Sequence, residues 1–397
     1  MDSLTRFKSL DSFLIKHERL WRPAPFTQLH LPWELEFSEL SRWLRSRRLD
    51  QSDLSGEALY RLDAPEPFQS IARVAQLASE LHELPRLHQS EPRADATSIP
   101  GRKWQQVTAF AEHIPRSKNN HWLDWCAGKG YLGRLLAQQG GTLTCLESDR
   151  SLVEYGVALS DRAAVNASHL CVDVMSPDVE SHIHSHHYPV ALHACGELHM
   201  RLLQLASGKG CQSIALSPCC YNRIKSENYQ TLSNAARASG LRLHRNDLAL
   251  PLRESVTAGA RERRQRDQSM AWRLAFDLLQ RELRGTDEYL STPSLPTSWL
   301  QKPFKQFCCD LANLRHLPRP GERDWHALEN QGWRRLAEVR NLELLRALFR
   351  RPMEVWLLLD RVMMLEERGY RVQLGTFCDV SVTPRNALIL ATMDAKK

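Results

Sequence analysis

The fold is decided by residues 123–133, which read Leu-Asp-Trp-Cys-Ala-Gly-Lys-Gly-Tyr-Leu-Gly. A short apolar run from Trp122 breaks into a glycine turn, and residues 131–137 then show apolar side chains at helical spacing. A strand, a glycine turn and a helix in this order are typical of α/β proteins that hold nucleotide-like cofactors, because glycine lets the backbone approach the ligand. This stretch therefore predicts a cofactor site at the turn.

Strand and helix patterns alternate along the chain after this turn. Further strands are predicted at residues 143–146, 169–174, 190–193, 213–216, 371–377 and 387–392. Alternating strands and helices favour a parallel, doubly wound sheet. We therefore predict an α/β, Rossmann-like fold with a helical insertion before its last two strands.

The domain organisation follows from where the strand pattern stops. Apolar residues recur at helical spacing before residue 85 and through much of the region after residue 252, which is rich in arginine. A polar, proline-bearing stretch at residues 84–101 indicates a linker. The predicted domains are an N-terminal helical region (1–95), a core (100–252), an arginine-rich helical insertion (253–352) and a closing helix with two strands (353–397).

Composition restricts the class of protein. The 42% hydrophobic and 25% charged residues are ordinary for a soluble globular chain of 397 residues. No run of about 18 apolar residues occurs, so no membrane span is expected. The ten cysteines lack zinc-finger spacing, which favours reduced thiols in the cytoplasm over a secreted disulfide framework. The net charge of +7 is a weak indication of an anionic partner, and a soluble protein with a few extra arginines is the alternative.

The glycines by themselves leave two cofactors open. Gly128, Gly130 and Gly133 match G-x-G-x-x-G, the fingerprint of dinucleotide-binding enzymes. A nicotinamide-dependent enzyme is therefore a competing interpretation of this turn.

Acidic residues at the ends of three predicted strands favour S-adenosylmethionine. Asp124 ends the first strand, where it can meet the ammonium group of the methionine part and would repel a pyrophosphate. Glu147 ends the second strand and suits the ribose hydroxyls, which both cofactors carry. Asp173 ends the third strand and suits the adenine amine. Three acids fit a cofactor without phosphate, so a methyltransferase is the favoured interpretation.

Three motifs resemble those of a known group of enzymes. They are Asp-Trp-Cys-Ala-Gly-Lys-Gly-Tyr-Leu at 124–132, Leu-His-Ala-Cys-Gly-Glu-Leu at 192–198 and Pro-Cys-Cys-Tyr at 218–221. They resemble the class I methyltransferase domain of the methyltransferase-like 25 type, a group that includes a protein named for an rRNA adenine dimethylase domain. Segments of residues 358–386 are similar to the closing part of that domain. The resemblance covers about residues 100–225 and 353–393, and it implies a class I fold that binds S-adenosylmethionine.

The resemblance also bears on the substrate. A more distant similarity to tRNA 2′-O-methyltransferases, which carry paired cysteines after a late strand, implies an RNA substrate. The sequence departs from the adenine dimethylase pattern, because His193-Ala-Cys-Gly196 replaces the motif that holds the target amine. Cys126 also replaces the first glycine of the common acidic-x-Gly-x-Gly pattern.

The candidate site residues lie at the predicted strand ends. The predicted cofactor contacts are Asp124, Cys126, Ala127, Gly128, Gly130, Tyr131, Leu132, Glu147, Asp173, Val174, His193 and Cys195. The predicted catalytic residues are His193, Cys219 and Cys220, and the predicted substrate contacts are Tyr221, Asn222, Arg385 and Asn386. His193 is a candidate general base because its pKa lies near neutrality, and a hydrogen-bonded structural residue is the alternative.

Four cysteines are expected to converge at the carboxyl ends of the strands. They are Cys126, Cys195, Cys219 and Cys220. Three interpretations are open: packing around a crowded pocket, contact with the substrate, or a metal or redox site. A cysteine nucleophile, as in RNA cytosine-5 methyltransferases, is a further alternative. Because the spacing is unlike that of a zinc ribbon, no metal is predicted.

Clusters of charged and histidine residues complete the inventory of candidate sites. Residues 261–284 offer arginines for RNA phosphates, or form a solvated helix laced with ion pairs. The arginines at 42, 45, 47 and 48 predict a solvated helix face. The histidines at 182, 184, 186 and 187 predict a solvated loop, with metal binding as the alternative.

Together these features predict an S-adenosylmethionine-dependent methyltransferase that acts on RNA, either tRNA or rRNA. The alternatives are a methyltransferase for small molecules or proteins, and a non-catalytic Rossmann-like module that binds RNA or a protein. We expect a cytoplasmic protein without a membrane association, and the sequence identifies no obligate protein partner.

Overall fold

The computed structural model describes residues 2–54, 56–88, 99–138, 140–252 and 260–393. The chain divides into two compact units, each built from separate segments. The sheet unit comprises Met1–Ile15, Ala78–Leu252 and Met353–Lys397, and the helical unit comprises Lys16–Leu77 and Arg253–Pro352. The N-terminal segment thus contributes to both units. Most of the predicted linker lies outside the described residues.

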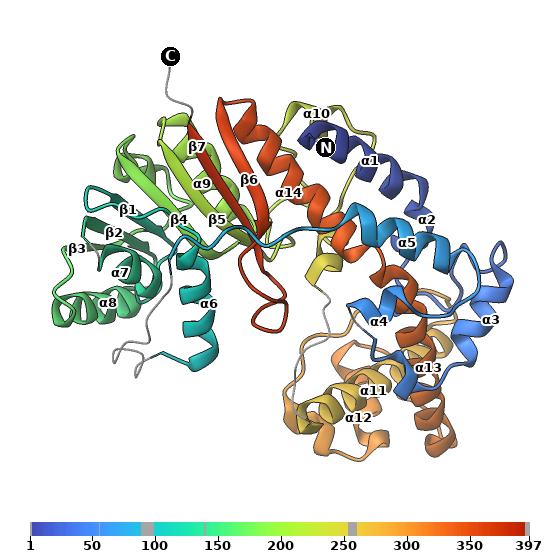
Figure 1. The fold of residues 1–397 in the computed structure, drawn as a ribbon. Coiled ribbons are helices and arrows are strands. Elements are labelled where there is room, and N and C mark those ends of the chain that lie inside the picture. The colour runs from blue at the N-terminus through green and yellow to red at the C-terminus, as the bar shows by residue number, and fades with distance from the viewer. Residues whose placement is uncertain (1, 55, 89–98, 139, 253–259, 394–397) are drawn as a thin grey trace. The chain divides into compact units, whose positions relative to one another are not determined.

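A seven-stranded sheet forms the centre of the sheet unit, with the order β3-β2-β1-β4-β5-β7-β6 (Figure 1). Its strands are β1 (His121–Trp125), β2 (Thr142–Glu147), β3 (Ala167–Cys171), β4 (His187–Cys195), β5 (Ser213–Cys219), β6 (Tyr370–Thr376) and β7 (Ala387–Met393). The first five strands are parallel, and β7 is antiparallel to both β5 and β6. The predicted α/β, Rossmann-like fold is confirmed.

Most strands differ in extent from the sequence prediction, and β3 and β4 show the physical reason. β3 pairs only with β2, and the ladder ends at the pair Glu147–Cys171. Asp173 therefore lies in the loop after β3 and not at its last position. β4 lies between β1 and β5 and is extended by both neighbours, since β1 pairs with its first half and β5 with its second half. The ends of β3 and β4 are thus set by their neighbouring strands, and the local sequence pattern cannot predict them.

The sheet unit also contains α-helices from each of its segments. They are α1 (Ser3–Lys16), α6 (Gly101–Glu112), α7 (Tyr131–Ala137), α8 (Arg150–Arg162), α9 (Glu197–Gly208), α10 (Asn234–Ala238) and α14 (Arg350–Glu366). Two 3-10 helices, η3 (Pro177–His182) and η4 (Asp247–Leu252), complete the unit. α7 packs on β1 and β2, α8 on β3, and α9 on β4 and β5. Phe110, Trp122 and Leu136 are fully buried in the core between α6, α7 and β1.

A buried carboxylate ties the segment after β5 to α14. The carboxylate of Asp360 accepts hydrogen bonds from Tyr229 Oη (2.7 Å), Leu232 N (3.0 Å), Ser233 N (2.7 Å) and Ser233 Oγ (2.7 Å). Arg361 Nη1 donates to Tyr229 Oη at 3.1 Å, and both charged residues are fully buried. Asp360 and Arg361 belong to the closing segment of the resemblance, and their role here is to hold the fold together.

The helical unit is built around two long helices, α11 (Ala260–Arg284) and α13 (Trp325–Ala347). Gly332 lets them approach closely, because a Cβ at this position would collide with the backbone oxygen of Ala271. Trp272 packs against Phe304 and Phe307 with ring centroids 5.5 and 5.1 Å apart. The remaining elements are α2 (Glu18–Trp21), α3 (Ser38–Ser46), η1 (Leu49–Ser52), α4 (Glu57–Tyr60), α5 (Phe68–Ala78), η5 (Thr297–Gln301) and α12 (Phe304–Leu314).

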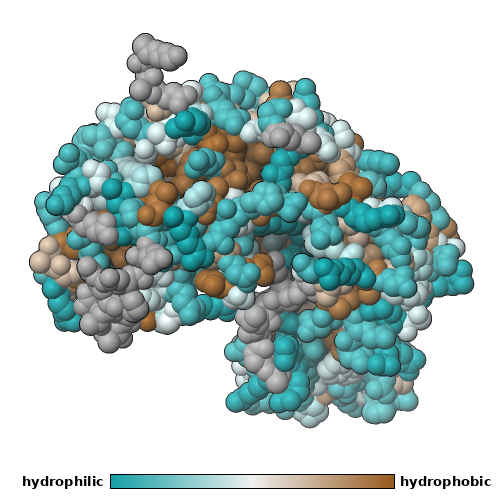
Figure 2. All heavy atoms as spheres, viewed as in Figure 1, coloured by the Kyte–Doolittle hydropathy of each residue, from teal (hydrophilic) through white to brown (hydrophobic). Residues whose placement is uncertain are grey.

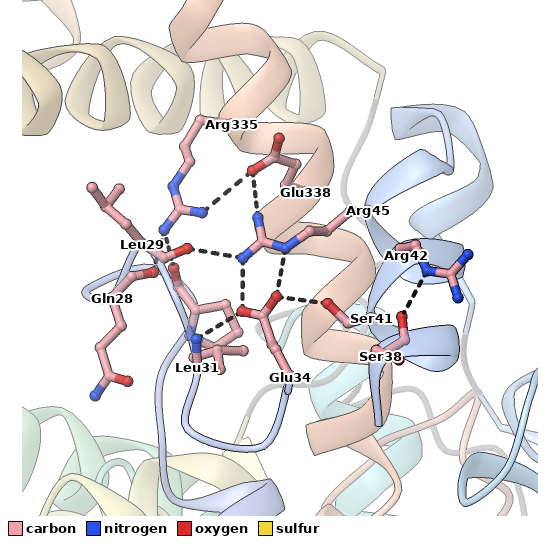
Figure 3. A network of polar contacts seen from close by, with 11 residues as sticks. Gln28, Leu29, Leu31, Glu34, Ser38, Ser41, Arg42, Arg45, Arg335 and Glu338 are labelled. Carbon is pink, nitrogen blue, oxygen red and sulfur yellow. Dashed lines mark hydrogen bonds and ion pairs between the residues drawn. The ribbon is translucent and has the colours of Figure 1, made fainter. Parts of the chain in front are cut away.

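A polar network centred on Arg45 joins α3 and α13 within the helical unit (Figure 3). Arg45 donates to both carboxylate oxygens of Glu34 at 2.7 Å and to Glu338 at 2.9 Å. Burial would raise the pKa of Glu34, but hydrogen bonds from Arg45, Ser41 Oγ and Leu31 N lower it to about 2. The charged form of Glu34 is therefore the one that the fold stabilises.

The prediction of a solvated arginine face is wrong for Arg45, whose side chain is only 22% exposed. Arg47 Nε donates to Asn341 Oδ1 at 3.1 Å, while Arg42 and Arg48 are exposed. The sequence predicted that these arginines lie together on one short helix. The acids that pair with Arg45, Glu34 and Glu338, lie outside that helix, so its spacing gave no sign of them.

The outer surface is mostly polar in the view of Figure 2, with hydrophobic residues in separate patches. Over the described residues, no helix combines the length and the apolar character that crossing a bilayer requires.

Candidate active site

The glycine turn joins β1 to α7. Glycine is needed at its three glycine positions for two different structural reasons. Gly128 has φ +56°, and a Cβ added there would meet no atom within 4 Å, so its outer side is open. A Cβ at Gly130 would lie 2.8 Å from His169 Cε1, and one at Gly133 would lie 2.5 Å from Leu143 Cδ1. Gly130 and Gly133 are thus required for close packing. Gly128 is the position where a ligand can approach the backbone.

Glu147 at the end of β2 reaches back to this turn. Its Oε2 accepts a hydrogen bond from Gly128 N at 2.9 Å, and its Oε1 accepts from Ser148 N at 2.8 Å and Asp149 N at 3.0 Å. These bonds fix the carboxylate beside the open side of Gly128. The structure therefore brings together two of the predicted cofactor residues.

Asp124 is buried beneath the turn, with only 3% of its surface exposed. Its Oδ2 accepts a hydrogen bond from Gly133 N at 2.9 Å, so it ties β1 to the first turn of α7. Burial raises its pKa to about 7, against the opposing effects of the Gly133 hydrogen bond and the charge of Arg134. Asp124 thus has a structural role, and its predicted contact with the cofactor stays a prediction.

Replacing Asp124 by Asn should change how stability depends on pH. The folded-state pKa is raised, so the contribution of the carboxyl is fully present below about pH 4 and is lost as pH rises through about 7. The wild-type chain should lose up to about 4 kcal/mol relative to Asp124→Asn over this window. The Asn side chain can still accept the Gly133 hydrogen bond.

The measurement is urea unfolding of both proteins between pH 4 and 8, followed by circular dichroism. A free-energy difference between the two proteins that stays constant over this range would show that Asp124 is ionised throughout and would contradict the assignment.

The remaining predicted cofactor residues have varied surroundings. Asp173 is exposed, and its Oδ1 accepts from Met175 N at 2.9 Å. Val174 and Leu132 are buried, while Ala127 and Tyr131 are half-buried. Cys126 has φ +56°, and burial raises its pKa to about 12, so its thiol stays protonated at neutral pH.

His193 at the end of β4 is held by a residue that the sequence analysis did not identify. Gln106 of α6 donates from Nε2 to Val382 O at 3.2 Å, so its Oε1 faces His193 Nε2 at 2.8 Å. His193 Nε2 then carries the ring proton, and Nδ1 is left as an acceptor. Burial, aided by the charge of Lys103, lowers the pKa of His193, so the ring is neutral at physiological pH. The sequence gave no sign of this contact, because a glutamine in a helix has no distinctive pattern.

Three of the four predicted cysteines converge. The sulfur atoms of Cys195, Cys219 and Cys220 all lie within 4.8 Å of one another, and Cys126 is outside this group. The sulfurs of Cys195 and Cys219 are 3.6 Å apart, so the two thiols are in contact but not bonded.

Two predicted substrate residues are largely buried. Tyr221 is 2% exposed, and its hydroxyl donates to Glu354 Oε1 at 3.4 Å. Asn386 Nδ2 donates to Cys378 O at 2.8 Å. Arg385 and Asn222 are half-buried, and Arg385 Nη2 donates to Leu252 O at 3.2 Å. Packing explains the positions of Tyr221 and Asn386, and substrate contact by any of the four stays a prediction.

The histidine-rich loop lies at the amino end of the central strand β4, whereas His193 and the cysteine cluster lie at the carboxyl ends of the strands. His187 begins β4, and the rings of His186 and His187 contact each other with centroids 4.6 Å apart. Burial, together with the charges of neighbouring histidines, lowers the pKa of His187 to about 4. Within the described part of the chain, these histidines are not among the groups arranged to hold a metal ion.

Comparison with known proteins gives the reaction class of this site. Residues 102–227 match the family model of a methyltransferase domain. These residues carry a methyltransferase domain, with S-adenosylmethionine as its cofactor. The methyltransferase domain includes the glycine turn, Glu147, His193 and the three converging cysteines, whereas Arg385 and Asn386 lie outside the match. The nicotinamide alternative is not supported.

No curated protein matches the sequence. Among solved structures, one match is coclaurine N-methyltransferase bound to N-methylheliamine and SAH, at 12% identity and a TM-score of 0.25. The match covers 54% of this chain and 58% of that chain, so this chain spans little more than half of that enzyme.

Proposed function

We propose that this protein transfers a methyl group from S-adenosylmethionine to RNA, either tRNA or rRNA. The observation that supports an RNA substrate is the distribution of charge. Residues 253–352 contain 19 Lys and Arg against 13 Asp and Glu, a net charge of +6 out of +7 for the whole chain. The excess of positive charge thus lies in the segment inserted into the methyltransferase fold. An anionic nucleic acid backbone is the partner that such charge favours.

The described arginines of this insertion include two contrasting groups. Arg281, Arg335 and Arg346 are buried, and each pairs with a carboxylate of the helical unit. Five others are exposed, and none of them forms an ion pair with any residue that the structure describes. They are Arg261, Arg263, Arg264, Arg319 and Arg334. These five are the candidates for phosphate contacts. The buried part of α11 is thus not the solvated face that one sequence interpretation expected, and phosphate contact by its exposed arginines is part of the proposal.

The residues of the turn fit S-adenosylmethionine. Gly128 provides an open side, and the carboxylate of Glu147 beside it suits the ribose hydroxyls. Asp173 is exposed and suits the adenine amine. When bound, the cofactor supplies a methyl group on a sulfonium.

His193 is the proposed general base. Its Nδ1 is an acceptor, because Gln106 holds the proton on Nε2. Nδ1 can therefore take the proton from an acceptor hydroxyl or amine as the methyl group is transferred. Gln106 is a positioning residue that fixes the tautomer and the orientation of the ring.

The finer family assignment belongs to the same proposal. The motifs at the strand ends support the methyltransferase-like 25 type, and the subtype is a proposal. All ten cysteines are free, which supports a reducing compartment such as the cytoplasm.

Removing the exposed charge at the start of α11 should weaken RNA binding. In the triple variant Arg261→Ala/Arg263→Ala/Arg264→Ala, we expect affinity for single-stranded RNA to fall about 10- to 100-fold at 0.1 M salt. The slope of log affinity against log salt should decrease by about 2, since each phosphate contact contributes about 0.7. Affinity for S-adenosylmethionine should not change. Fluorescence anisotropy of labelled RNA at several salt concentrations measures the RNA affinity and the salt slope.

A matched control removes the same charge from paired arginines of the same unit. Arg48, Arg61 and Arg73 are exposed, and each pairs with an acid: Asp50, Glu57 and Glu66. The control triple variant to Ala should leave the salt slope within about 0.5 of the wild-type value. Equal losses in both triple variants would mean that only the net charge matters and that α11 is not a binding surface.

The reaction itself is tested with S-adenosylmethionine labelled on its methyl group. The full chain is incubated with total RNA, protein and metabolite fractions from cells that lack it, and we expect label in the RNA fraction. Label in the protein or metabolite fraction alone would contradict the RNA proposal. Cofactor binding without label in any fraction would favour the non-catalytic alternative.

A further inference from the structure

Three thiols meet at the carboxyl ends of two neighbouring strands. Cys195 is the last residue of β4, and Cys219 and Cys220 end and follow β5. Cys195 and Cys219 are register partners in the parallel ladder. All three sulfur atoms lie within 4.8 Å of one another. Cys219 is buried and the other two are half-buried, so solvent species can reach the cluster.

The backbone is bent where it brings these sulfurs together. The pairing of β4 with β5 is irregular between Leu192 and Cys195. His193 has φ +69° and Cys220 has φ +48°, values that side chains other than glycine adopt rarely. Such left-handed conformations in non-glycine residues cluster at functional sites. Simple packing of small apolar side chains would not require them.

The geometry argues against a disulfide and suits a metal ion. The distance of 3.6 Å between the sulfurs of Cys195 and Cys219 is far longer than the S–S bond of about 2.05 Å. Two thiolates on a tetrahedral Zn²⁺ with Zn–S bonds of about 2.3 Å would be separated by about 3.8 Å. The observed distance is therefore close to that required for ligands of one ion.

The charges around the cluster suit thiolates. The positively charged residues Arg385 and Arg223 lie near Cys220. Three thiolates on one Zn²⁺ carry a net charge of −1, which these two arginines offset. Both arginines come from segments adjacent to the cluster, since Arg223 N donates to Cys220 O at 2.9 Å and Arg385 O accepts from Ser217 Oγ at 3.3 Å.

We propose that Cys195, Cys219 and Cys220 bind one Zn²⁺ ion through their sulfur atoms and leave its fourth position open. Each thiol releases its proton to solvent as its bond to zinc forms. Three protein ligands and one open position are the arrangement of catalytic and not of structural zinc sites. An oxygen or sulfur ligand in the open position would be acidified, with a bound water lowered to a pKa of about 7.

The proposal departs from the expectation of no metal, because that expectation used the spacing of cysteines along the chain. Only the pairing of β4 with β5 places residues 195, 219 and 220 together. The site stands on its geometry alone and does not depend on whether the substrate is RNA. Its test therefore needs neither S-adenosylmethionine nor a methyl acceptor.

The test is anaerobic titration of the reduced, metal-free full chain with Co²⁺, followed by displacement with Zn²⁺. We expect thiolate-to-cobalt charge-transfer absorption that saturates at one ion per chain and disappears when Zn²⁺ is added. In Cys220→Ser, we expect affinity for Co²⁺ to fall at least about 100-fold. Cys309→Ser is the matched control, because Cys309 is also half-buried and also the second member of a Cys-Cys pair. It should bind like the wild type.

A second measurement identifies the ligands directly. Bound Zn²⁺ should protect Cys195, Cys219 and Cys220 from alkylation by iodoacetamide, as located by peptide mass spectrometry, while Cys171 is modified. Circular dichroism shows whether each variant is folded, and the protection experiment uses the wild-type chain in case a variant is not. No charge-transfer absorption in the wild type, or no zinc-dependent protection of these three thiols, would overturn the proposal. A disulfide bond between Cys195 and Cys219 that persists after treatment with a reductant would also overturn it.

Discussion

Replacing Gly128 by Val should reduce affinity for S-adenosylmethionine at least about 100-fold while the chain remains folded. The backbone at Gly128 has φ +56°, and the space beyond its Cα is open in the free protein. A valine side chain would fill that space and would strain the backbone, because a β-branched residue rarely adopts this φ. The carboxylate of Glu147, which accepts from Gly128 N, would also shift. Isothermal titration with S-adenosylmethionine measures the loss.

The matched control for this variant is Gly210→Val. Gly210 also has a positive φ, +72°, and a Cβ there would also meet no atom within 4 Å. It lies just before β5, at the amino end of the strand and away from the glycine turn. The control should share the backbone strain but retain cofactor affinity. Equal affinity losses in both folded variants, or retained affinity in Gly128→Val, would mean that the pocket is misplaced.

Replacing Asp360 by Ala should lower the free energy of unfolding by about 3–5 kcal/mol. The buried carboxylate accepts hydrogen bonds from Tyr229, Leu232 and Ser233, and all these donors would lose their partner. Arg361 is also fully buried, and the variant would remove the negative charge of the residue that precedes it. Urea unfolding followed by circular dichroism measures the effect, as a lower midpoint of the transition.

Glu366→Ala provides the control on the same helix. Glu366 is exposed, and among the described residues its carboxylate accepts a hydrogen bond from Ser3 Oγ at 2.8 Å. Its replacement should change stability by less than about 0.5 kcal/mol. A midpoint for Asp360→Ala close to that of Glu366→Ala would show that the Asp360 network does not stabilise the fold.

Much of the fold was accessible from sequence because the signals are local. The glycine turn, the order of strands and helices and the two late strands all appear as patterns within about ten residues. Strand lengths were less accessible. β4 runs from His187 to Cys195, longer than its pattern, because strands on both sides offer it backbone partners. β3 stops at Cys171 because its single neighbour, β2, ends there.

The surroundings of the candidate site were less accessible than its position. Asp124 and Glu147 were identified as acids near the turn, but their bonds to Gly133 and Gly128 depend on how β1, β2 and α7 pack. Gln106 was missed, because a glutamine in a helix has no distinctive pattern and acquires its role only when α6 lies beside His193. In the same way, the sequence of the insertion does not distinguish its buried, paired arginines from its exposed ones. Only the tertiary structure gives the partners of each.

The sequence by itself determined that residues 123–133 form a strand end, a glycine turn and the start of a helix, and it predicted a cofactor site there. Its glycines left two cofactors open, and the acids predicted at the ends of the first three strands favoured S-adenosylmethionine. The tertiary structure alone decided that Asp124 is a buried structural acid and that Gly128 is the open face of the turn. It also decided which of the four cysteines expected to converge meet in one cluster, since Cys195, Cys219 and Cys220 do and Cys126 lies outside it. The physical reason is that a turn is fixed by neighbours along the chain, whereas burial and convergence depend on strand pairing between distant segments.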